Sequence, residues 1–181
     1  MALKATIYKA TLNVTDMVRH VYEEFPLTLA CHPSETEARM MLRLLAFALY
    51  ADERLEFGRG ISTDDEPDLW QKSLSGEIEL WIDLGIPDEN RIRKACGRAS
   101  QVVLLVYGER SAQVWWPKNS AQLERFKNLV VLQISDSSMQ ELASLASSNM
   151  ALQCVIDESQ VSLTSSEHDE LISVELAHLK N

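Results

Sequence analysis

Residues 77–85 of this 181-residue chain read Glu-Ile-Glu-Leu-Trp-Ile-Asp-Leu-Gly, with apolar side chains at every second position. Side chains of a β-strand point alternately to opposite faces, so this stretch predicts a strand with two different faces. One face carries only isoleucine and leucine, and the other carries Glu77, Glu79, Trp81 and Asp83. Like charges on one face destabilise a sheet unless solvent, a cation or basic side chains compensate. A function therefore has to explain where these carboxylates point.

The carboxylates of Asp68 and Asp83 are the first candidate site. Asp68 begins a short strand, predicted at 68–71, that pairs with residues 77–85 through a turn at 73–76. If both carboxylates meet at one end of this hairpin, they form an oxygen-rich pocket suited to Mg²⁺, which can activate water for phosphodiester hydrolysis. The same pattern also fits a solvated hairpin face without any function. The residues alone leave both interpretations open.

The basic face of a helix predicted at 88–98 is the second candidate. Arg91, Lys94 and Arg98 have the spacing that places side chains on one side of a helix. Because this helix directly follows the strand at 77–85, Lys94 is within reach of the carboxylate pocket. The alternative is a solvated charged face.

A third feature is the apolar helix predicted from Ser34 to about Ala51. Ser34 as N-cap, followed three residues later by Glu37, has the pattern of a capping box. The high apolar content of this helix indicates burial around most of its circumference.

Two arginines lie within that apolar helix. Arg39 and Arg43 follow Glu35 at intervals of four residues, a spacing that favours ion pairs. Burial of either arginine would require acidic partners, such as the face that carries Asp83.

The remaining pattern gives the fold class. The first two strands are expected to pair around a turn at Asp16, and 112–116 is expected to form a hairpin with 102–107. Helices that alternate with buried strands predict an α/β fold, with a mixed β-sheet flanked by helices, in one domain spanning residues 1–181. Further strands are expected at 3–14, 20–31, 102–107, 112–116, 129–134, 150–156, 160–165 and 170–176, and further helices at 121–128 and 137–147.

The amino-acid composition bears on the expected binding partners and on the cellular compartment. The net charge of −10, from 27 acidic and 17 basic residues, opposes strong nucleic-acid binding, which draws its affinity from a basic surface. Three widely spaced cysteines without a Cys-x-x-Cys motif predict buried, reduced thiols in a cytoplasmic protein. Neither a membrane-spanning apolar run nor a secretory leader is expected from the sequence.

Several longer stretches resemble the motifs of the bacterial YaeQ family, and the resemblance covers essentially the whole chain. These stretches are His32-Pro33-Ser34-Glu35-Thr36, Arg39-Met40-Met41-Leu42-Arg43-Leu44-Leu45-Ala46-Phe47, Leu55-Glu56-Phe57-Gly58-Arg59-Gly60, Glu66-Pro67-Asp68-Leu69-Trp70, Leu80-Trp81-Ile82-Asp83-Leu84-Gly85, Arg91-Ile92-Arg93-Lys94-Ala95 and Val114-Trp115-Trp116.

The resemblance implies a variant of the PD-(D/E)xK restriction-endonuclease-like fold, with extra N-terminal and C-terminal strands. In that pattern Pro67-Asp68 matches the first metal-binding element and Asp83 the second acidic position. The lysine of the superfamily falls two residues after the second acid, where this chain has Gly85. Lys94 is the candidate for a lysine that has moved to the following helix. Either Glu37 or Glu35 is the candidate for a helix-borne acid.

The first functional hypothesis is a Mg²⁺-dependent phosphodiesterase or nuclease. Asp68 and Asp83 would hold the metal, and Lys94 would stabilise developing charge or position the attacking water, with Glu37 as a further acid. This hypothesis requires the first three side chains to share one cleft.

Two hypotheses without catalysis remain beside it. A descendant of the nuclease fold could bind nucleic acid or a protein partner through Arg39, Arg43, Arg59 and Arg91. An interaction protein could instead use an exposed hairpin edge.

Overall fold

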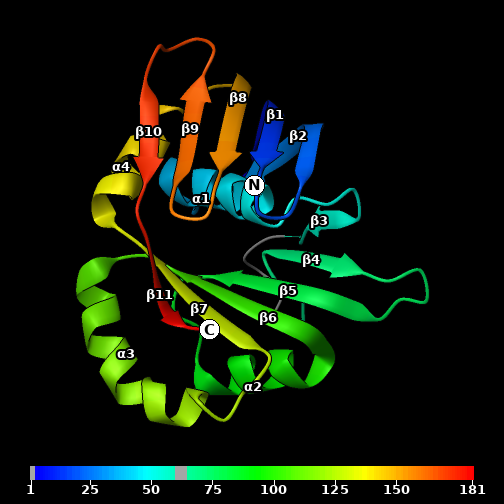
Figure 1. Cartoon of the computed structure of the whole chain (residues 1–181), viewed down its shortest axis with the longest axis vertical. Helices are drawn as coiled ribbons and strands as arrows, with labels where there is room; N and C mark the ends of the chain where they lie inside the picture. The colour runs from blue at the N-terminus through cyan, green and yellow to red at the C-terminus, as the bar shows by residue number, and fades with distance from the viewer. Residues whose placement is uncertain (1–2, 60–64) are drawn as a thin grey trace. The chain divides into compact units, whose positions relative to one another are not determined.

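The structure, a computed structural model, describes residues 3–59 and 65–181 (Figure 1). The sequence also predicts a loop at 56–68, where Gly58, Gly60 and Pro67 lie among charged residues. Residues 60–64 of this stretch lie outside the described residues, and strand β3 (Leu55–Phe57) occupies its first two positions.

The chain divides into two compact units. The first comprises Met1–Glu53 and Ser137–Glu175, and the second comprises Arg54–Asp136 and Leu176–Asn181. The predicted α/β class, with mixed sheets flanked by helices, is confirmed, although the strands form two sheets and not one. The single domain and the restriction-endonuclease-like core stay predictions.

The first unit is built on a five-stranded sheet with the strand order β10-β9-β8-β1-β2. β1 pairs antiparallel with β2 and parallel with β8, so the sheet is mixed. The early strand pair and the three late strands expected from the sequence are thereby confirmed. These strands are β1 (Thr6–Asp16), β2 (Val21–Cys31), β8 (Asn149–Ile156), β9 (Val161–Ser165) and β10 (Leu171–Val174).

Strict alternation gives this sheet one buried and one exposed face. From Ala10 to Asp16, every second residue of β1 is buried. Helix α1 (Glu37–Leu49) packs on the buried face, where the ring of Phe47 meets that of Phe25 edge to face, with 5.2 Å between centroids. Because these strands are apolar on one face only, a layer on that face is enough to bury their apolar side chains.

Helix α1 begins two residues later than the capping-box pattern predicts. Thr36 is the N-cap, and its Oγ1 accepts a hydrogen bond from the Arg39 backbone N–H. The Ser34 hydroxyl lies 2.7 Å from His32 Nδ1 instead, so Ser34 as N-cap is wrong. The expected burial around the helix is confirmed, since every residue from Met40 to Ala48 is buried.

The second unit is built on a six-stranded sheet with the order β11-β7-β6-β5-β4-β3. β5, β6 and β7 run parallel, and the other pairs are antiparallel. The elements are β3 (Leu55–Phe57), β4 (Leu69–Lys72), β5 (Ile78–Leu84), α2 (Glu89–Arg98), β6 (Ala99–Val106), α3 (Glu109–Leu123), β7 (Leu129–Ile134) and β11 (Leu176–Lys180). Helix α4 (Asp136–Ser144) follows β7, and all its residues except Asp136 belong to the first unit.

The strand predicted at 112–116 and the helix predicted at 121–128 are wrong. Helix α3 occupies Glu109–Leu123 instead, with Pro117 inside it. Since β6 and β7 run parallel, the chain must cross from one end of the sheet to the other between them. Such a crossover needs a dozen residues or more and is usually helical, which overrides the β propensity of Val114-Trp115-Trp116.

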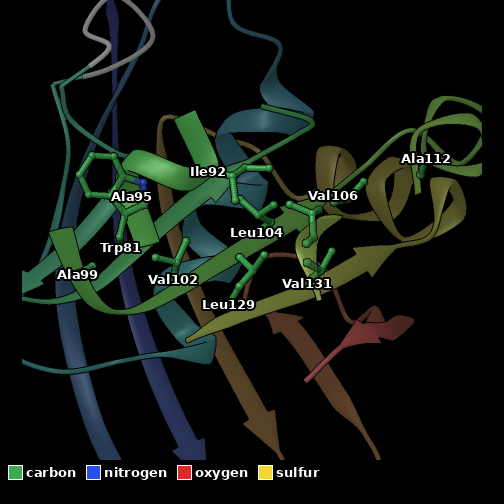
Figure 2. Packing of buried hydrophobic residues seen from close by; sticks show 11 residues of the cluster. Trp81, Ile92, Ala95, Ala99, Val102, Leu104, Val106, Ala112, Leu129 and Val131 are labelled. Carbon is green, nitrogen blue, oxygen red and sulfur yellow. The ribbon is translucent and has the colours of Figure 1, made fainter. Parts of the chain in front are cut away.

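The core of the second unit lies between its sheet and its two helices (Figure 2). Ile92 and Ala95 of α2 pack against Val102 and Leu104 of β6, in a cluster that also includes Trp81. Figure 2 shows Trp81 at the α2 end of this cluster, beside Ala95. Helix α2 therefore packs on the face of the sheet that carries Trp81.

The three cysteines are free thiols, two of them buried and Cys96 half-buried. Burial raises the pKa of Cys154 to about 12 and that of Cys96 to about 11. In the part of the chain that the structure describes, no helix is both long and apolar enough to cross a membrane.

Candidate functional site

Both carboxylate oxygens of Asp83 are engaged by one arginine. Arg91 Nε donates to Asp83 Oδ2 at 2.9 Å, and Arg91 Nη2 donates to Oδ1 at 3.0 Å. Trp81 Nε1 donates to the same Oδ2 at 3.0 Å, as expected for side chains two residues apart on one strand face. The Asp83 side chain is 4% exposed and that of Arg91 25%. The site therefore centres on a buried carboxylate in a bidentate ion pair.

Local geometry brings Arg91 back over the end of β5. Gly85 follows the strand with φ of +93°, a backbone conformation that L side chains rarely adopt. Asp88 then caps α2, since its Oδ1 accepts from the Arg91 backbone N–H. The turn at Gly85 and the cap at Asp88 place Arg91 in the first turn of α2, next to the end of β5.

Asp68 lies at the same end of the hairpin. It precedes the Leu69–Ile82 pair by one residue, so continuing the register places it opposite Asp83. Its Oδ2 accepts a hydrogen bond of 2.9 Å from the Leu84 backbone N–H. The two aspartates predicted to approach each other are thus neighbours across the β4–β5 pair.

A glycine holds the segment before β4 in place. The Gly58 backbone N–H donates to the Asp68 carbonyl oxygen at 2.9 Å. A Cβ atom at Gly58 would lie 1.9 Å from the Pro67 carbonyl oxygen, closer than real Cβ atoms come. This close approach of two backbones requires glycine.

Arg91 also borders a cavity of about 300 Å³ beside α2. Lys94 and Arg98 line the same cavity, with Trp81 and with the acidic Asp65 and Asp88. We call it the α2 cavity.

The three basic side chains of the α2 cavity are held differently. Arg91 Nη2 donates both to Asp83 Oδ1 and to the backbone carbonyl oxygen of Glu66. Arg98 Nη1 donates to the Asp65 carbonyl oxygen at 3.1 Å, and its Cζ lies 5.1 Å from the centre of the Trp81 ring. Lys94 is exposed, and within residues 3–59 and 65–181 no hydrogen bond or ion pair engages its Nζ.

Asp68 and Asp83 are not among the described residues that line the α2 cavity. Arg91 binds Asp83 and also lines the cavity, which connects this carboxylate with the site of Lys94. The single cleft expected for Asp68, Asp83 and Lys94 stays a prediction.

The arrangement of the carboxylates does not fit Mg²⁺. A magnesium ion needs carboxylate oxygens directed at it, whereas both oxygens of Asp83 accept from Arg91 and one oxygen of Asp68 accepts from Leu84. Among the described residues, no three His, Cys, Asp or Glu side chains gather as a metal site would require. We therefore derive no step that passes through a metal, and Mg²⁺ stays a prediction.

The predicted arginines of α1 pair with Glu35, within the first unit. Arg43 donates from Nε and Nη2 to the two oxygens of Glu35, at 2.9 and 2.8 Å, and Arg39 Nη1 donates to Glu35 Oε1 at 3.1 Å. Arg43 Nη2 also donates to the Ala30 carbonyl oxygen. Glu35 is therefore an acidic partner of both arginines, and the Asp83 face as a further partner stays a prediction.

Glu37 and Arg59 are the remaining candidates. Glu37 is exposed at the start of α1, and its Oε1 accepts from the Tyr8 hydroxyl at 3.0 Å. Arg59, in the second unit, is exposed, with Nε 3.4 Å from Glu66 Oε1. The functional roles assigned to them, and to Arg39 and Arg43, stay predictions.

The Asp83–Arg91 pair is the feature that sequence reasoning missed. Arg91 is assigned to substrate binding and Asp83 to a metal, although the two are mutual partners. The available signal was the position of Arg91 in the first turn of a helix that directly follows the strand of Asp83.

Charge is distributed unequally between the two units. The first contains 5 basic and 14 acidic residues, a net charge of −9, and the second contains 12 basic and 13 acidic residues, a net charge of −1. The acidity of the chain as a whole is therefore a property of the first unit.

Comparison with known proteins gives consistent matches. The family model described as YaeQ protein matches residues 1–174. The protein named Uncharacterized protein YaeQ from Escherichia coli (strain K12) is 48% identical over 169 residues, which is 93% of each chain, and that from Salmonella typhi matches equally well. The crystal structure of a YaeQ protein from Xanthomonas axonopodis pv. citri has a TM-score of 0.92 and 42% identity, covering 96% of this chain and 97% of that one. That from Pseudomonas syringae has a TM-score of 0.91 and 38% identity, covering 98% and 97%.

Proposed function

This chain belongs to the YaeQ family, and from the geometry of its second unit we propose that it binds nucleic acid by its phosphodiester backbone at the α2 cavity. The observation that carries the proposal is the convergence of Arg91, Lys94 and Arg98 on one cavity. Guanidinium and ammonium groups are the side chains that bind phosphate oxygens.

Each basic residue has a separate part in this proposal. Lys94 supplies the exposed ammonium, which binds phosphate as a point charge. Arg98 is held over Trp81 and directs its charge at the cavity. Arg91 neutralises Asp83 and so removes a carboxylate charge that would repel phosphate. Trp81 is 2% exposed as a whole residue, which leaves too little surface for a base to stack on its ring, so we infer binding without base recognition.

The distribution of charge supports this proposal. The overall net charge of −10 argues against nucleic-acid binding, but only −1 of it belongs to the unit that contains the α2 cavity. Electrostatic attraction to phosphate depends on local basic groups within about a Debye length, roughly 8–10 Å, more than on the total charge.

Replacing Lys94 by alanine is expected to weaken binding to a duplex or single strand about threefold to tenfold at low salt. Because one phosphate contact is lost, the slope of log K against log salt should fall in magnitude by about one. Titration of fluorescently labelled DNA and RNA, by anisotropy at several salt concentrations, measures both quantities. Lys94→Arg should retain most of the affinity, since it keeps the charge.

Lys118→Ala is the matched control, because Lys118 is an exposed lysine of the same unit that lies outside the α2 cavity. Equal losses in Lys94→Ala and Lys118→Ala would show diffuse binding away from the cavity. An absence of binding to any nucleic acid at about 50 mM salt, a condition that favours phosphate contacts, would rule the function out.

Metal-dependent phosphodiester cleavage is a second candidate, favoured by the β4–β5 register, which when continued brings Asp68 next to Asp83. In the ion-paired arrangement described above the two carboxylates do not form a metal site. Catalysis by this pair would require the Asp83–Arg91 ion pair to open. Cleavage of DNA or RNA that depends on Mg²⁺ or Mn²⁺ and disappears in Asp83→Ala would establish it. Equal cleavage by wild type and Asp83→Ala preparations would identify a contaminating nuclease.

A further inference from the structure

The exposed face of the five-stranded sheet in the first unit is almost free of charge. Five side chains of β1, five of β2, four of β8 and two each of β9 and β10 point outward, opposite to the buried set. We call these 18 residues the outer face. Lys9 and Glu24 are its two charged residues, whereas 24% of all residues in the chain are charged. Depletion of charge is characteristic of the centre of a protein interface.

Exposed apolar side chains also lie on the same face, spread between its two edges. Ile7, Tyr22 and Leu171 belong to it, with 51%, 60% and 69% of their surfaces exposed. Met17 and Val18, in the turn between β1 and β2, are also exposed. A second surface that covers the whole face would remove these apolar side chains from water, which favours association.

We propose that the outer face is a dimer interface, which packs against the outer face of a second copy of this chain. Two sheets that pack face to face lie about 10 Å apart with strands inclined at roughly 30°, as in a β-sandwich. In a two-fold dimer the same surface serves both copies, so it has to be complementary to itself.

The two charges of the outer face satisfy that condition. Lys9 pairs with Thr28 and Glu24 pairs with Asn13 in the β1–β2 register, so the two charges are four residues apart along the strands. This is roughly 13 Å, too far for an ion pair within one copy. A two-fold axis that lies between the sheets and crosses the strands near Thr11 brings Lys9 of each copy beside Glu24 of the other.

The area of the outer face is sufficient for a specific dimer. With strands about 4.8 Å apart and about 6.6 Å between successive outward residues, each residue covers roughly 32 Å² of the sheet plane. Two faces of 18 residues then cover roughly 1,150 Å² in projection, and more as accessible surface, which reaches the ~1,200 Å² at which specific interfaces begin.

Charge reversal tests the proposal directly. Lys9→Glu and Glu24→Lys each place like charges opposite one another twice in the dimer, and each is expected to weaken dimerisation about tenfold or more. The double variant restores opposite charges and should return to within about threefold of wild type. Sedimentation equilibrium of the full chain measures the dimer dissociation constant. Because the first unit has a net charge of −9, wild-type dimerisation should strengthen between about 50 and 300 mM salt.

Glu158→Lys is the matched control, since it changes the net charge as Glu24→Lys does but lies in the turn between β8 and β9. Thermal unfolding of each variant, measured at a concentration where it is monomeric, identifies any loss of folding. A wild-type chain that stays monomeric up to about 100 µM, where even weak specific dimers form, overturns the proposal. So does a dissociation constant that responds to Lys9→Glu and Glu24→Lys no more than to Glu158→Lys, or one that the double variant fails to restore.

Discussion

Replacing Glu35 by alanine is expected to lower the free energy of unfolding by about 3–5 kcal/mol, because the Arg43 guanidinium then stays buried without its carboxylate. The side chains of Glu35 and Arg43 are only 3% and 6% exposed, so water cannot take the place of the lost partner. Arg39 loses its ion pair to the same carboxylate. Urea unfolding of the full chain measures the change.

A double variant tests whether the loss of stability in Glu35→Ala comes from the unpaired buried charge or from any substitution at the start of α1. Glu35→Leu with Arg43→Met should recover much of the stability lost in Glu35→Ala, since the most buried charge of the network is removed together with its partner. Glu53→Ala, at an exposed acid of the same unit, should change stability by less than about 0.5 kcal/mol. A loss below about 1 kcal/mol in Glu35→Ala would contradict this account of the network.

Asp83→Ala is expected to lower the free energy of unfolding by about 3 kcal/mol. The substitution leaves the partly buried Arg91 guanidinium without its bidentate partner and leaves Trp81 Nε1 without an acceptor. If Asp83 were instead one of several carboxylates held together as metal ligands, its removal would relieve the repulsion between like charges and raise the free energy of unfolding. The direction of the change therefore distinguishes a structural ion pair from a metal site.

The response to Mg²⁺ provides an independent check on Asp83. A ligand that binds only the folded chain raises its melting temperature, so about 10 mM Mg²⁺ should leave wild-type Tm unchanged if Arg91 occupies the carboxylate. Asp83→Asn keeps an acceptor for Trp81 and should lose less stability than Asp83→Ala. A rise of Tm with Mg²⁺ in wild type that is absent in both variants would contradict the ion-pair account and support metal binding.

Much of the fold could be predicted because its signals are local. Strand β5 follows from the alternation at 77–85, and α2 from Asp88 and the acidic residue after it. Helix α3 could not be predicted in this way, because Val114-Trp115-Trp116 has local β preference and the decisive constraint is the parallel pairing of β6 with β7. That pairing joins residues far apart in the sequence.

The candidate site was predicted in part. Alternation correctly places Trp81 and Asp83 on one face, and the hairpin correctly brings Asp68 to the same end of β5. The partner of Asp83 could not be found from spacing, since it depends on the turn at Gly85 and on the direction in which α2 leaves that turn.

The Glu35 network shows the same limit. The four-residue spacing from Glu35 to Arg39 correctly indicates an ion pair. The much more buried contact with Arg43 spans eight residues, and it forms because Glu35 precedes the helix and its carboxylate extends along α1. Spacing rules that assume both residues lie within a helix do not describe such a contact.

The raised pKa values of the cysteine thiols have a practical consequence. Desolvation by burial is the leading cause at Cys31, Cys96 and Cys154 alike. At a pKa of about 11, roughly one Cys96 thiol in ten thousand is ionised at neutral pH, and the thiolate is the form that alkylating reagents attack. In the folded chain Cys96 and Cys154 are therefore expected to react slowly with maleimide dyes. A cysteine introduced at an exposed position should react faster than either of them.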